Sequence, residues 1–371
     1  MKYYILAGEA SGDLHASNLM KALQQEDPEA DFRFWGGDLM QQQGGTLVKH
    51  YRDLAFMGFL EVVLNIRTIF KNLAFCKKDI LDYKPDVIIY VDYPGFNLRI
   101  AKWARAQGFK NYYYISPQIW AWKEGRIKDI KRDIDELFVI LPFEKEFYEK
   151  KHQFPVHFVG HPLLDAINSR EPINPENFRS KNNLDERPII ALLPGSRKQE
   201  IQKMLEGMLS ITGNFKDYQF VIAGAPSQDL EFYEPFLQKN RVHIVMNETY
   251  NLLDVSTAAL VTSGTATLET ALFKVPEVVC YKGGRISYEI AKRVINLDYI
   301  SLVNLIMDRE VVKELIQTDF NTKSLSTALS SILDKTKRTQ LFDAYFELEK
   351  KLGGAGASKN TAKLIYQKLK N

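Results

Sequence analysis

Cysteine is scarce in this 371-residue sequence: only Cys76 and Cys280 are present, far apart in the chain. Neither belongs to a CxxC pair, so the sequence contains no redox motif and no paired thiols for a zinc ion. Two isolated thiols are typical of a protein from a reducing cytoplasm rather than of a disulfide-bonded secreted protein. We therefore expect a cytoplasmic location and no metal.

Long apolar runs are missing as well. No run approaches the ~20 residues that a membrane-spanning helix needs, and the N-terminus lacks the basic and apolar regions of a secretory signal peptide. Neither sign of charge dominates, because the formal net charge is only +3. This slight excess does not predict binding to nucleic acid.

Two common nucleotide-binding motifs are also absent. The sequence contains no GxxxxGK[ST] loop, and no GxGxxG follows an expected strand. The first absence argues against a P-loop protein, and the second argues against a dinucleotide such as NAD. We expect no organic cofactor.

The sequence does contain a regular alternation of strand-like and helix-like segments. Apolar runs at Asp86–Asp92, Asn111–Ser116 and Glu136–Pro142 predict buried strands, and amphipathic stretches separate them. Such βαβ units build a parallel sheet covered by helices. Because 371 residues suffice for two cores, we expect an α/β protein with two Rossmann-like domains facing a central cleft.

A polar stretch with several prolines divides the chain. We expect an N-terminal domain, an interdomain linker, a C-terminal domain and a helical tail at residues 1–165, 166–187, 188–345 and 346–371. From Leu305 onward the pattern predicts helices alone. Gly353, Gly354 and Gly356 mark a bend in the tail.

Two strand–turn–helix junctions of the C-terminal domain combine small residues with a cation and an acid. One strand ends at Pro194-Gly195-Ser196-Arg197, and another ends at Ser263-Gly264-Thr265-Ala266. A helix N-terminus offers backbone N–H groups and a positive dipole end to a phosphate. The Arg197 guanidinium can donate two hydrogen bonds to phosphate oxygens. The Glu269 carboxylate can accept hydrogen bonds from both hydroxyls of a ribose. The pattern predicts a nucleoside diphosphate site, which comprises Ser196, Arg197, Ser263, Gly264, Thr265, Ala266 and Glu269.

Each junction also has a simpler interpretation. PGSR can be a tight turn with an exposed arginine, and SGTATLE can be a helix capping box. Their occurrence at two strand ends of one sheet favours the binding function over these two structural roles.

Acidic residues follow the expected strands of the N-terminal domain. Glu9 and Asp13 lie in GEASGD after the first strand, and Asp92 ends the strand before Tyr93-Pro94. Ligands of open parallel sheets bind beyond the carboxyl ends of the strands, so each carboxylate is a candidate general base. The alternatives are helix capping for Asp13 and a turn-forming role for Asp92.

Three other polar groups favour structural roles. His15 is expected to pack on its helix, and His161, in VGHPLLD, can line a cleft or form a hinge. Asp133-Ile134-Asp135 matches a DxD triplet that binds a metal in some glycosyltransferases. Its charge-rich surroundings favour a solvated face instead.

The segment Met57–Lys78 is unusually apolar for a surface helix, yet it is too polar to cross a bilayer. Basic residues lie among and just after its apolar ones, which is typical of a helix in a membrane interface. A wholly buried core helix is an equal alternative. The candidate residues for contact with membrane or acyl chains are Met57, Phe59, Val62, Ile66, Ile69 and Phe70.

Together the motifs resemble the lipid-A-disaccharide synthase family of bacterial glycosyltransferases. The matching pieces occur in the family's order over nearly the whole chain, and they are Gly8–Asp13, Met57–Val63, Tyr114–Trp122, Phe158–Asp165, LLPGSRKQEI, TSGTATLETAL and Asp298–Ile306. The resemblance implies a GT-B fold whose C-terminal domain holds most of the nucleotide sugar. It also implies that Arg197 and Asn304 lie in the nucleotide site and Glu9 in the catalytic cleft.

The family joins UDP-2,3-diacylglucosamine to 2,3-diacylglucosamine 1-phosphate with inversion, and it forms lipid A disaccharide 1-phosphate and UDP. The resemblance therefore implies two lipid substrates, association with the inner face of the cytoplasmic membrane, and a homodimer that exchanges C-terminal helices. One position departs from the family pattern D-x-P-D-F-N, because Gly95 replaces the second acid. The base must then be Asp92, Glu9 or Asp13.

Two other kinds of function stay open. A UDP-N-acetylglucosamine 2-epimerase, or the glycosyltransferase of lipid-linked muramyl peptide, would share the UDP-sugar chemistry. An epimerase needs no acyl-chain site, so the apolar segment after Met57 argues against it. Gly95 leaves open an inactive nucleotide-sugar-binding protein at the membrane.

Overall fold

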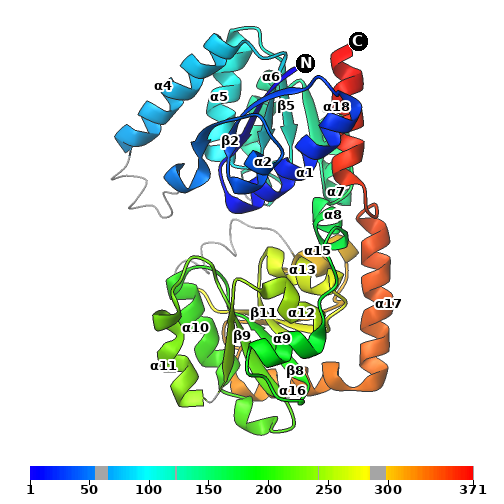
Figure 1. Cartoon of the computed structure of the whole chain (residues 1–371). Coiled ribbons are helices and arrows are strands. Elements are labelled where there is room, and N and C mark those ends of the chain that lie inside the picture. The colour runs from blue at the N-terminus through cyan, green and yellow to red at the C-terminus, as the bar shows by residue number, and fades with distance from the viewer. Residues whose placement is uncertain (55–65, 122, 241, 285–297, 371) are drawn as a thin grey trace. The chain divides into compact units, whose positions relative to one another are not determined.

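The structure, a computed structural model, describes residues 1–54, 66–121, 123–240, 242–284 and 298–370. The chain forms two compact units, one of Met1–Ser169 with Leu352–Asn371 and one of Arg170–Lys351. In each unit, helices cover both faces of a parallel sheet (Figure 1). The predicted α/β class with two Rossmann-like domains is confirmed.

The first unit contains a seven-stranded sheet of order β3-β2-β1-β4-β5-β6-β7. Its strands are β1 Lys2–Ala7, β2 Asp31–Gly36, β3 Thr46–His50, β4 Val87–Val91, β5 Asn111–Tyr114, β6 Glu136–Val139 and β7 His157–Phe158. Its helices are α1 Ala10–Glu26, α2 Asp38–Gln42, η1 Tyr51–Leu54, α4 Ile66–Tyr83, α5 Pro94–Ala106, η2 Glu124–Arg126, α6 Ile127–Asp133, α7 Pro142–Glu146, η3 Phe147–Lys151, α8 Pro162–Asn168 and α18 Ala357–Lys370. The strand order reverses between β1 and β4, where open parallel sheets leave room for a ligand.

The first sheet is buried on both faces because successive side chains of each strand point to opposite helix layers. In β1, Tyr4 and Leu6 join the core cluster of α4 and α5, whereas Tyr3 and Ile5 join that of α1 and α18. Strands buried on both faces appear in a sequence as continuous apolar runs. This burial explains why the apolar runs located β4, β5 and β6.

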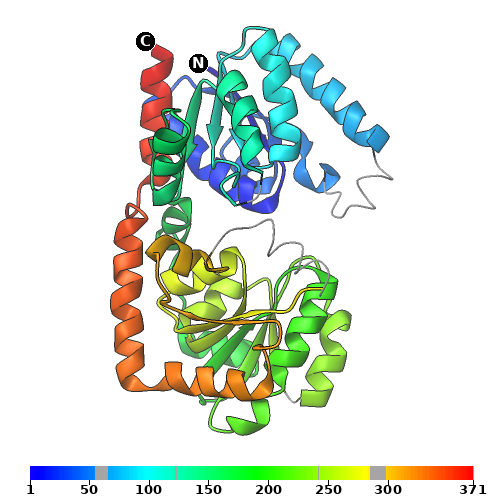
Figure 2. The ribbon, with the colours of Figure 1, turned by 180° about the vertical axis from the view of Figure 1, so that it is seen from behind.

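The C-terminal helix α18 is an integral part of the first unit. The Asp165 carboxylate in α8 accepts hydrogen bonds from the backbone N–H groups of Gly356 (2.5 Å) and Ser358 (2.8 Å) at the start of α18. Ala362 and Ile365 then pack into the core beside α1. Figures 1 and 2 show α18, in red, beside the first sheet.

The expected boundaries of the tail are therefore wrong. Residues 346–371 do not form one element, because α17 (Lys335–Lys351) lies in the second unit and α18 in the first. The bend between the two helices is confirmed, since Gly353, Gly354 and Gly356 all have positive φ angles (87°, 69° and 110°). Glycine adopts such angles without steric cost.

The second unit contains a six-stranded parallel sheet of order β10-β9-β8-β11-β12-β13. Its strands are β8 Ile189–Leu193, β9 Gln219–Gly224, β10 His243–Met246, β11 Ser256–Thr262, β12 Glu277–Tyr281 and β13 Lys313–Ile316. Its helices are α9 Pro175–Lys181, α10 Lys198–Leu209, η4 Thr212–Asn214, α11 Leu230–Asn240, α12 Thr249–Asp254, α13 Thr265–Leu272, α15 Leu302–Met307, α16 Thr322–Leu333 and α17 Lys335–Lys351.

Two expectations for this unit are wrong. The stretch 166–187 is no separate linker, because Phe178 of α9 and the following Leu184 pack into the core with β8. The helical pattern after Leu305 is interrupted by β13, which pairs in parallel with β12. A strand of four residues is too short for periodicity to separate it from a helix; pairing with β12 decides its conformation.

Candidate functional site

A cavity of about 250 Å³ lies at the carboxyl ends of β8, β9 and β11 in the second unit. Both predicted junctions form its walls, and the predicted residues that line it are Ser196, Ser263, Gly264, Thr265, Ala266 and Glu269. The remaining two, Arg197 and Asn304, are not among its lining residues. Parallel sheets place ligands at this edge, so the cavity is the candidate nucleotide site.

The first junction is shaped by Gly195. Its φ is +100°, and a Cβ atom there would lie 2.4 Å from a carboxylate oxygen of Glu200. Only glycine fits such a position. The Ser227 hydroxyl donates to the Ser196 carbonyl at 2.7 Å, which fixes the turn beside the cavity.

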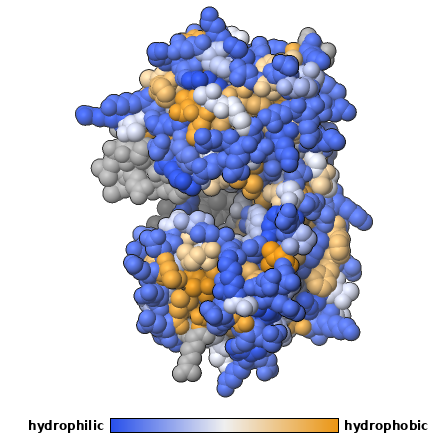
Figure 3. Space-filling view, in the orientation of Figure 1, coloured by the Kyte–Doolittle hydropathy of each residue, from blue (hydrophilic) through white to orange (hydrophobic). Residues whose placement is uncertain are grey.

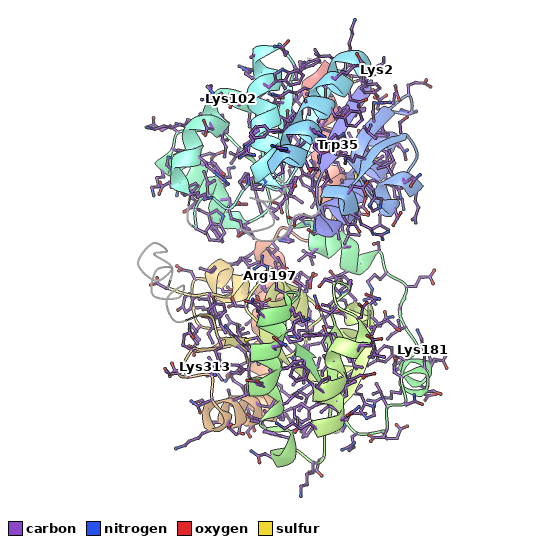
Figure 4. The ribbon with its side chains drawn as sticks, turned by 90° about the vertical axis from the view of Figure 1, so that its left-hand side faces the viewer. Lys2, Trp35, Lys102, Lys181, Arg197 and Lys313 are labelled. Carbon is purple, nitrogen blue, oxygen red and sulfur yellow. The ribbon has the colours of Figure 1, made fainter. Side chains whose placement is uncertain are left out.

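Arg197 is the N-cap residue of α10 and makes no side-chain capping hydrogen bond. Its side chain is exposed, and Figure 4 labels it at the start of α10. The first N–H groups of a helix lack partners within the helix. A guanidinium beside them adds a permanent positive charge, and this arrangement favours an anion-binding role over that of a plain turn.

The second junction opens toward the cavity at Gly264. This N-cap residue of α13 has φ +153°, and a Cβ atom there would meet no atom of the described residues within 4 Å. Ser263 donates instead to the Ile300 carbonyl (2.9 Å), and Glu269 accepts from the Tyr250 hydroxyl (3.0 Å). The capping-box alternative is therefore wrong, because neither side chain caps α13.

Asn304 has a structural use that the resemblance does not indicate. Its amide nitrogen donates to the Val312 carbonyl and to Glu314 (both 2.9 Å), and its amide oxygen accepts from the N–H groups of Val311 (2.8 Å) and Val312 (3.0 Å). The residue is fully buried. All four hydrogen-bonding positions of the amide are occupied, so the predicted nucleotide contact is not supported.

Strained backbone marks the carboxyl edge of the first sheet. Asp92 and Tyr93 after β4 have φ angles of 46° and 50°, and Ile115 after β5 has φ 63°. A left-handed φ is uncommon for residues other than glycine; aspartate and asparagine tolerate it best, and it is most costly for a β-branched residue such as Ile115. The Asp92 carbonyl accepts from the Tyr113 hydroxyl (2.5 Å) and the Asn97 amide (2.7 Å), which stabilises this conformation. Such strain is found at functional sites.

The environment of Asp92 suits a general base. Burial, together with the nearby negative charge of Glu9, raises the pKa of Asp92 to about 6. Glu9 is the exposed N-cap residue of α1 and makes no capping hydrogen bond. A Cβ atom at Gly8 would lie 2.3 Å from the Tyr93 ring, so glycine allows the two strand ends to approach. The structure thus brings Glu9 and Asp92 together.

Asp13 is used differently. Its carboxylate accepts hydrogen bonds from the N–H groups of Gly37 (2.7 Å), Leu39 (3.1 Å) and Met40 (3.1 Å). It therefore caps α2 rather than its own helix. Because three backbone N–H groups occupy its oxygens, we do not retain Asp13 as a candidate base.

The remaining polar groups are structural. Burial lowers the pKa of His15 to about 4 and that of His161 to about 3; His161 caps α8 through Nδ1. The expected solvated face at the DxD triplet is wrong, because Asp133 is buried against Arg132. Asp135 accepts from the Asn111 N–H at 2.8 Å.

The apolar segment is described only from α4 onward. Met57, Phe59 and Val62 lie outside the described residues, as does the side chain of Ile66. Ile69 packs against the core, whereas Phe70 is 61% exposed. The wholly buried alternative is therefore wrong for α4.

Two further aromatic or aliphatic side chains are exposed on α4, namely Phe75 (47%) and Leu81 (44%). The surface seen in Figure 3 is mostly hydrophilic with separate apolar patches on each unit. Within the described ranges, no helix is long and apolar enough to cross a membrane.

The sequence did not indicate Tyr250, which contacts the lining residue Glu269, or Arg170, which packs on Tyr250. Tyr250 lies in the short α12, which follows β10, and it reaches Glu269 of α13. Nothing in the sequence around Tyr250 indicates a partner, because the contact depends on how β9, β10 and β11 are ordered in the sheet.

Two Rossmann-like parallel-sheet units, one of them with a cavity between two helix N-termini, define a fold of the GT-B class. A co-structure of S. aureus MnaA with UDP has a TM-score of 0.70 and 15% identity, covering 100% of this chain and 97% of that one. The UDP-GlcNAc 2-epimerase from Neisseria meningitidis bound to UDP-GlcNAc has a TM-score of 0.67 and 13% identity, covering 100% of both. At these identities the likeness shows the fold alone.

The sequence decides the family. The lipid-A-disaccharide synthetase model matches residues 3–367. Lipid-A-disaccharide synthase from Geobacter metallireducens is 37% identical, covering 98% of this chain and 96% of that relative. The same enzyme from Coxiella burnetii (strain CbuG_Q212) is 35% identical, covering 98% and 97%. This chain belongs to the lipid-A-disaccharide synthetase family and is a glycosyltransferase.

Proposed function

We propose that the chain transfers 2,3-diacylglucosamine from its UDP derivative to 2,3-diacylglucosamine 1-phosphate, forming lipid A disaccharide 1-phosphate and UDP. The observation that carries this proposal is the membership of nearly the whole chain in the family. The cavity with two helix N-termini supports it.

UDP is held by the second unit in this proposal. The pyrophosphate lies against the turns at Ser196 and Gly264, and Arg197 pairs with its oxygens. Glu269 accepts hydrogen bonds from the ribose hydroxyls. Negative charge grows on the β-phosphate as the bond from the anomeric carbon to its oxygen breaks. Preorganised N–H groups and a guanidinium stabilise that charge in the transition state.

Asp92 is the general base in this proposal. It takes the proton of the attacking acceptor hydroxyl, whose oxygen forms the new bond at the opposite face of the anomeric carbon. Its raised pKa of about 6 leaves it mostly ionised at neutral pH and still basic enough to act. Glu9 tunes this pKa by its negative charge.

A UDP-release assay tests the reaction. We expect UDP only when both acylated substrates are present, because the acceptor hydroxyl is the nucleophile. Incubation of UDP-N-acetylglucosamine alone is the control for epimerisation. Formation of the 2-epimer without an acceptor would contradict the proposal, as would UDP binding without any turnover of the lipid pair.

We further propose that the exposed face of α4 contacts the inner face of the cytoplasmic membrane. Phe70 and Leu81 share this face with Arg67, Lys71 and Lys78, all of which are exposed. Apolar burial and attraction to anionic headgroups add in such a helix. Both proposed substrates carry acyl chains, so the enzyme must meet them at a bilayer.

Changing Phe70 and Leu81 together to serine should reduce sedimentation with vesicles of phosphatidylethanolamine and phosphatidylglycerol by at least about fivefold, since two large apolar groups no longer insert. The matched control changes Leu230 and Phe346, which are similarly exposed (48% and 55%) in the second unit, to serine. Equal binding of both variants and wild type would contradict docking through α4. The homodimer implied by the resemblance stays a prediction, and sedimentation equilibrium would test it.

A further inference from the structure

Glu269 does not stand alone in the wall of the cavity. One of its carboxylate oxygens, Oε1, accepts a hydrogen bond from the Tyr250 hydroxyl at 3.0 Å. Burial raises the pKa of Tyr250, so the phenol keeps its proton and acts as the donor. The other oxygen, Oε2, receives no such bond from Tyr250. Tyr250 therefore holds the carboxylate through one oxygen atom, Oε1.

Tyr250 itself packs against two neighbouring side chains. Its ring packs against Phe273 with 5.1 Å between ring centroids. The Arg170 guanidinium lies 5.4 Å from the Tyr250 ring centroid and 5.2 Å from that of Phe273. Planar guanidinium groups pack well on aromatic faces. The phenol therefore has little freedom to turn its hydroxyl away from Glu269.

Arg170 is anchored in turn by the same short helix. Its guanidinium donates to Asn251 Oδ1 at 2.6 Å and pairs with Asp254 at 3.1 Å. Arg170 and Tyr250 also line a second cavity of about 360 Å³, which shares Pro226 and Thr249 with the nucleotide cavity. The chain of contacts from Arg170 to Glu269 thus runs along the wall of the nucleotide site.

We propose that Tyr250, fixed by Arg170, is a positioning residue that orients the Glu269 carboxylate for the ribose hydroxyls and thereby sets the preference for a ribonucleotide. This inference rests on the proposed function, in which Glu269 binds the ribose. Two vicinal hydroxyls need acceptors at fixed positions. With Oε1 held by Tyr250, Oε2 and the remaining lone pair of Oε1 have defined directions.

The hydrogen bond also affects the charge of Glu269. Burial raises the pKa of this carboxyl group, and the bond from Tyr250 opposes the rise because it stabilises the anion. Without the phenol, the pKa of Glu269 should rise further. Ribose binding, which needs an acceptor, should then weaken as the pH falls.

Calorimetric titration of the Tyr250→Phe variant with UDP and with 2′,3′-dideoxy-UDP tests the proposal without relying on turnover. We expect UDP to bind about tenfold more weakly, the size of one hydrogen bond to a charged group. The dideoxy analogue should bind the variant and the wild type alike. The ratio of the two affinities should therefore fall about tenfold, whereas general damage to the cavity would weaken both ligands and keep the ratio.

The pH dependence provides a second readout. The UDP affinity of Tyr250→Phe should fall more steeply than that of the wild type between pH 8 and pH 5.5, because more Glu269 is protonated in the variant. Arg170→Lys keeps the charge but loses the planar stack, and it should shift the affinity ratio in the same direction by a smaller factor. An unchanged ratio and pH profile in Tyr250→Phe would overturn the proposal.

Two controls separate this inference from the proposed function. Tyr218→Phe removes a phenol hydroxyl just before the amino end of β9. The cavity lies at the carboxyl ends of the strands, so this change should leave both affinities unchanged. Glu269→Gln should weaken UDP but not the dideoxy analogue. If Glu269→Gln has no effect, the ribose contact itself is wrong. If Glu269→Gln weakens UDP and Tyr250→Phe does not, only the positioning role is wrong.

Discussion

Replacing Arg197 with alanine is expected to lower turnover by roughly 10²–10³-fold while leaving the fold intact. The residue precedes α10 as its N-cap, and its side chain is exposed, so little packing is lost. The charge on the departing UDP develops in the transition state. One lost preorganised contact to such a charge has an effect of about this size.

The measurement is kcat for the two lipid substrates, together with UDP affinity and the thermal unfolding temperature. Lys203→Ala is the matched control, because it removes an exposed positive charge from the same helix, which begins at Lys198. Arg197→Lys should retain part of the rate, since an ammonium lacks the bidentate geometry. Near-normal turnover of Arg197→Ala would show that the pyrophosphate is held elsewhere.

Replacing Asp92 with asparagine should lower kcat by roughly 10²–10⁴-fold, the range of a lost general base. Asparagine tolerates a left-handed φ, so the strained turn, with φ 46° at this residue, should persist. Substrate affinity should change little. Full activity of this variant would move the role of the base to Glu9.

The pH profile makes the assignment more specific. A base acts only when ionised, so kcat/KM should fall as the pH drops through about 6, the raised pKa of Asp92. Glu9→Gln removes a neighbouring negative charge and should therefore lower the Asp92 pKa and move this acid limb to lower pH. An acid limb that stays in place in Glu9→Gln would contradict the coupling of the two acids.

Gly95 offers a rescue of the same defect. A Cβ atom at this position would meet no atom of the described residues within 4 Å, so an aspartate can be accommodated where the family pattern has its second acid. Gly95→Asp in the Asp92→Asn background should recover part of the lost rate. The control combines Gly95→Asn with Asp92→Asn. It adds a side chain of the same size without a carboxylate, so it should recover none of the rate.

The sequence by itself determined the class of fold and the positions of the two strand–turn–helix junctions in the second unit. Doubly buried parallel strands are continuous apolar runs in a sequence, so β4, β5 and β6 were predictable from the order of apolar residues along the chain. Gly195 and Gly264 mark turns where the backbone adopts positive φ angles, 100° and 153°. These properties are local, because each depends on a few consecutive residues.

Only the tertiary structure decided which polar side chains are available for chemistry. Asp13 and Asn304 look like site residues in the sequence, yet backbone N–H and C=O groups from other segments occupy them. The pairing of β13 and the docking of α18 on Asp165 depend on partners far away in the chain. The contact of Tyr250 with Glu269 likewise arises from the strand order. A side chain's hydrogen-bonding capacity is used by whichever groups the fold brings within reach, and no local pattern records those groups.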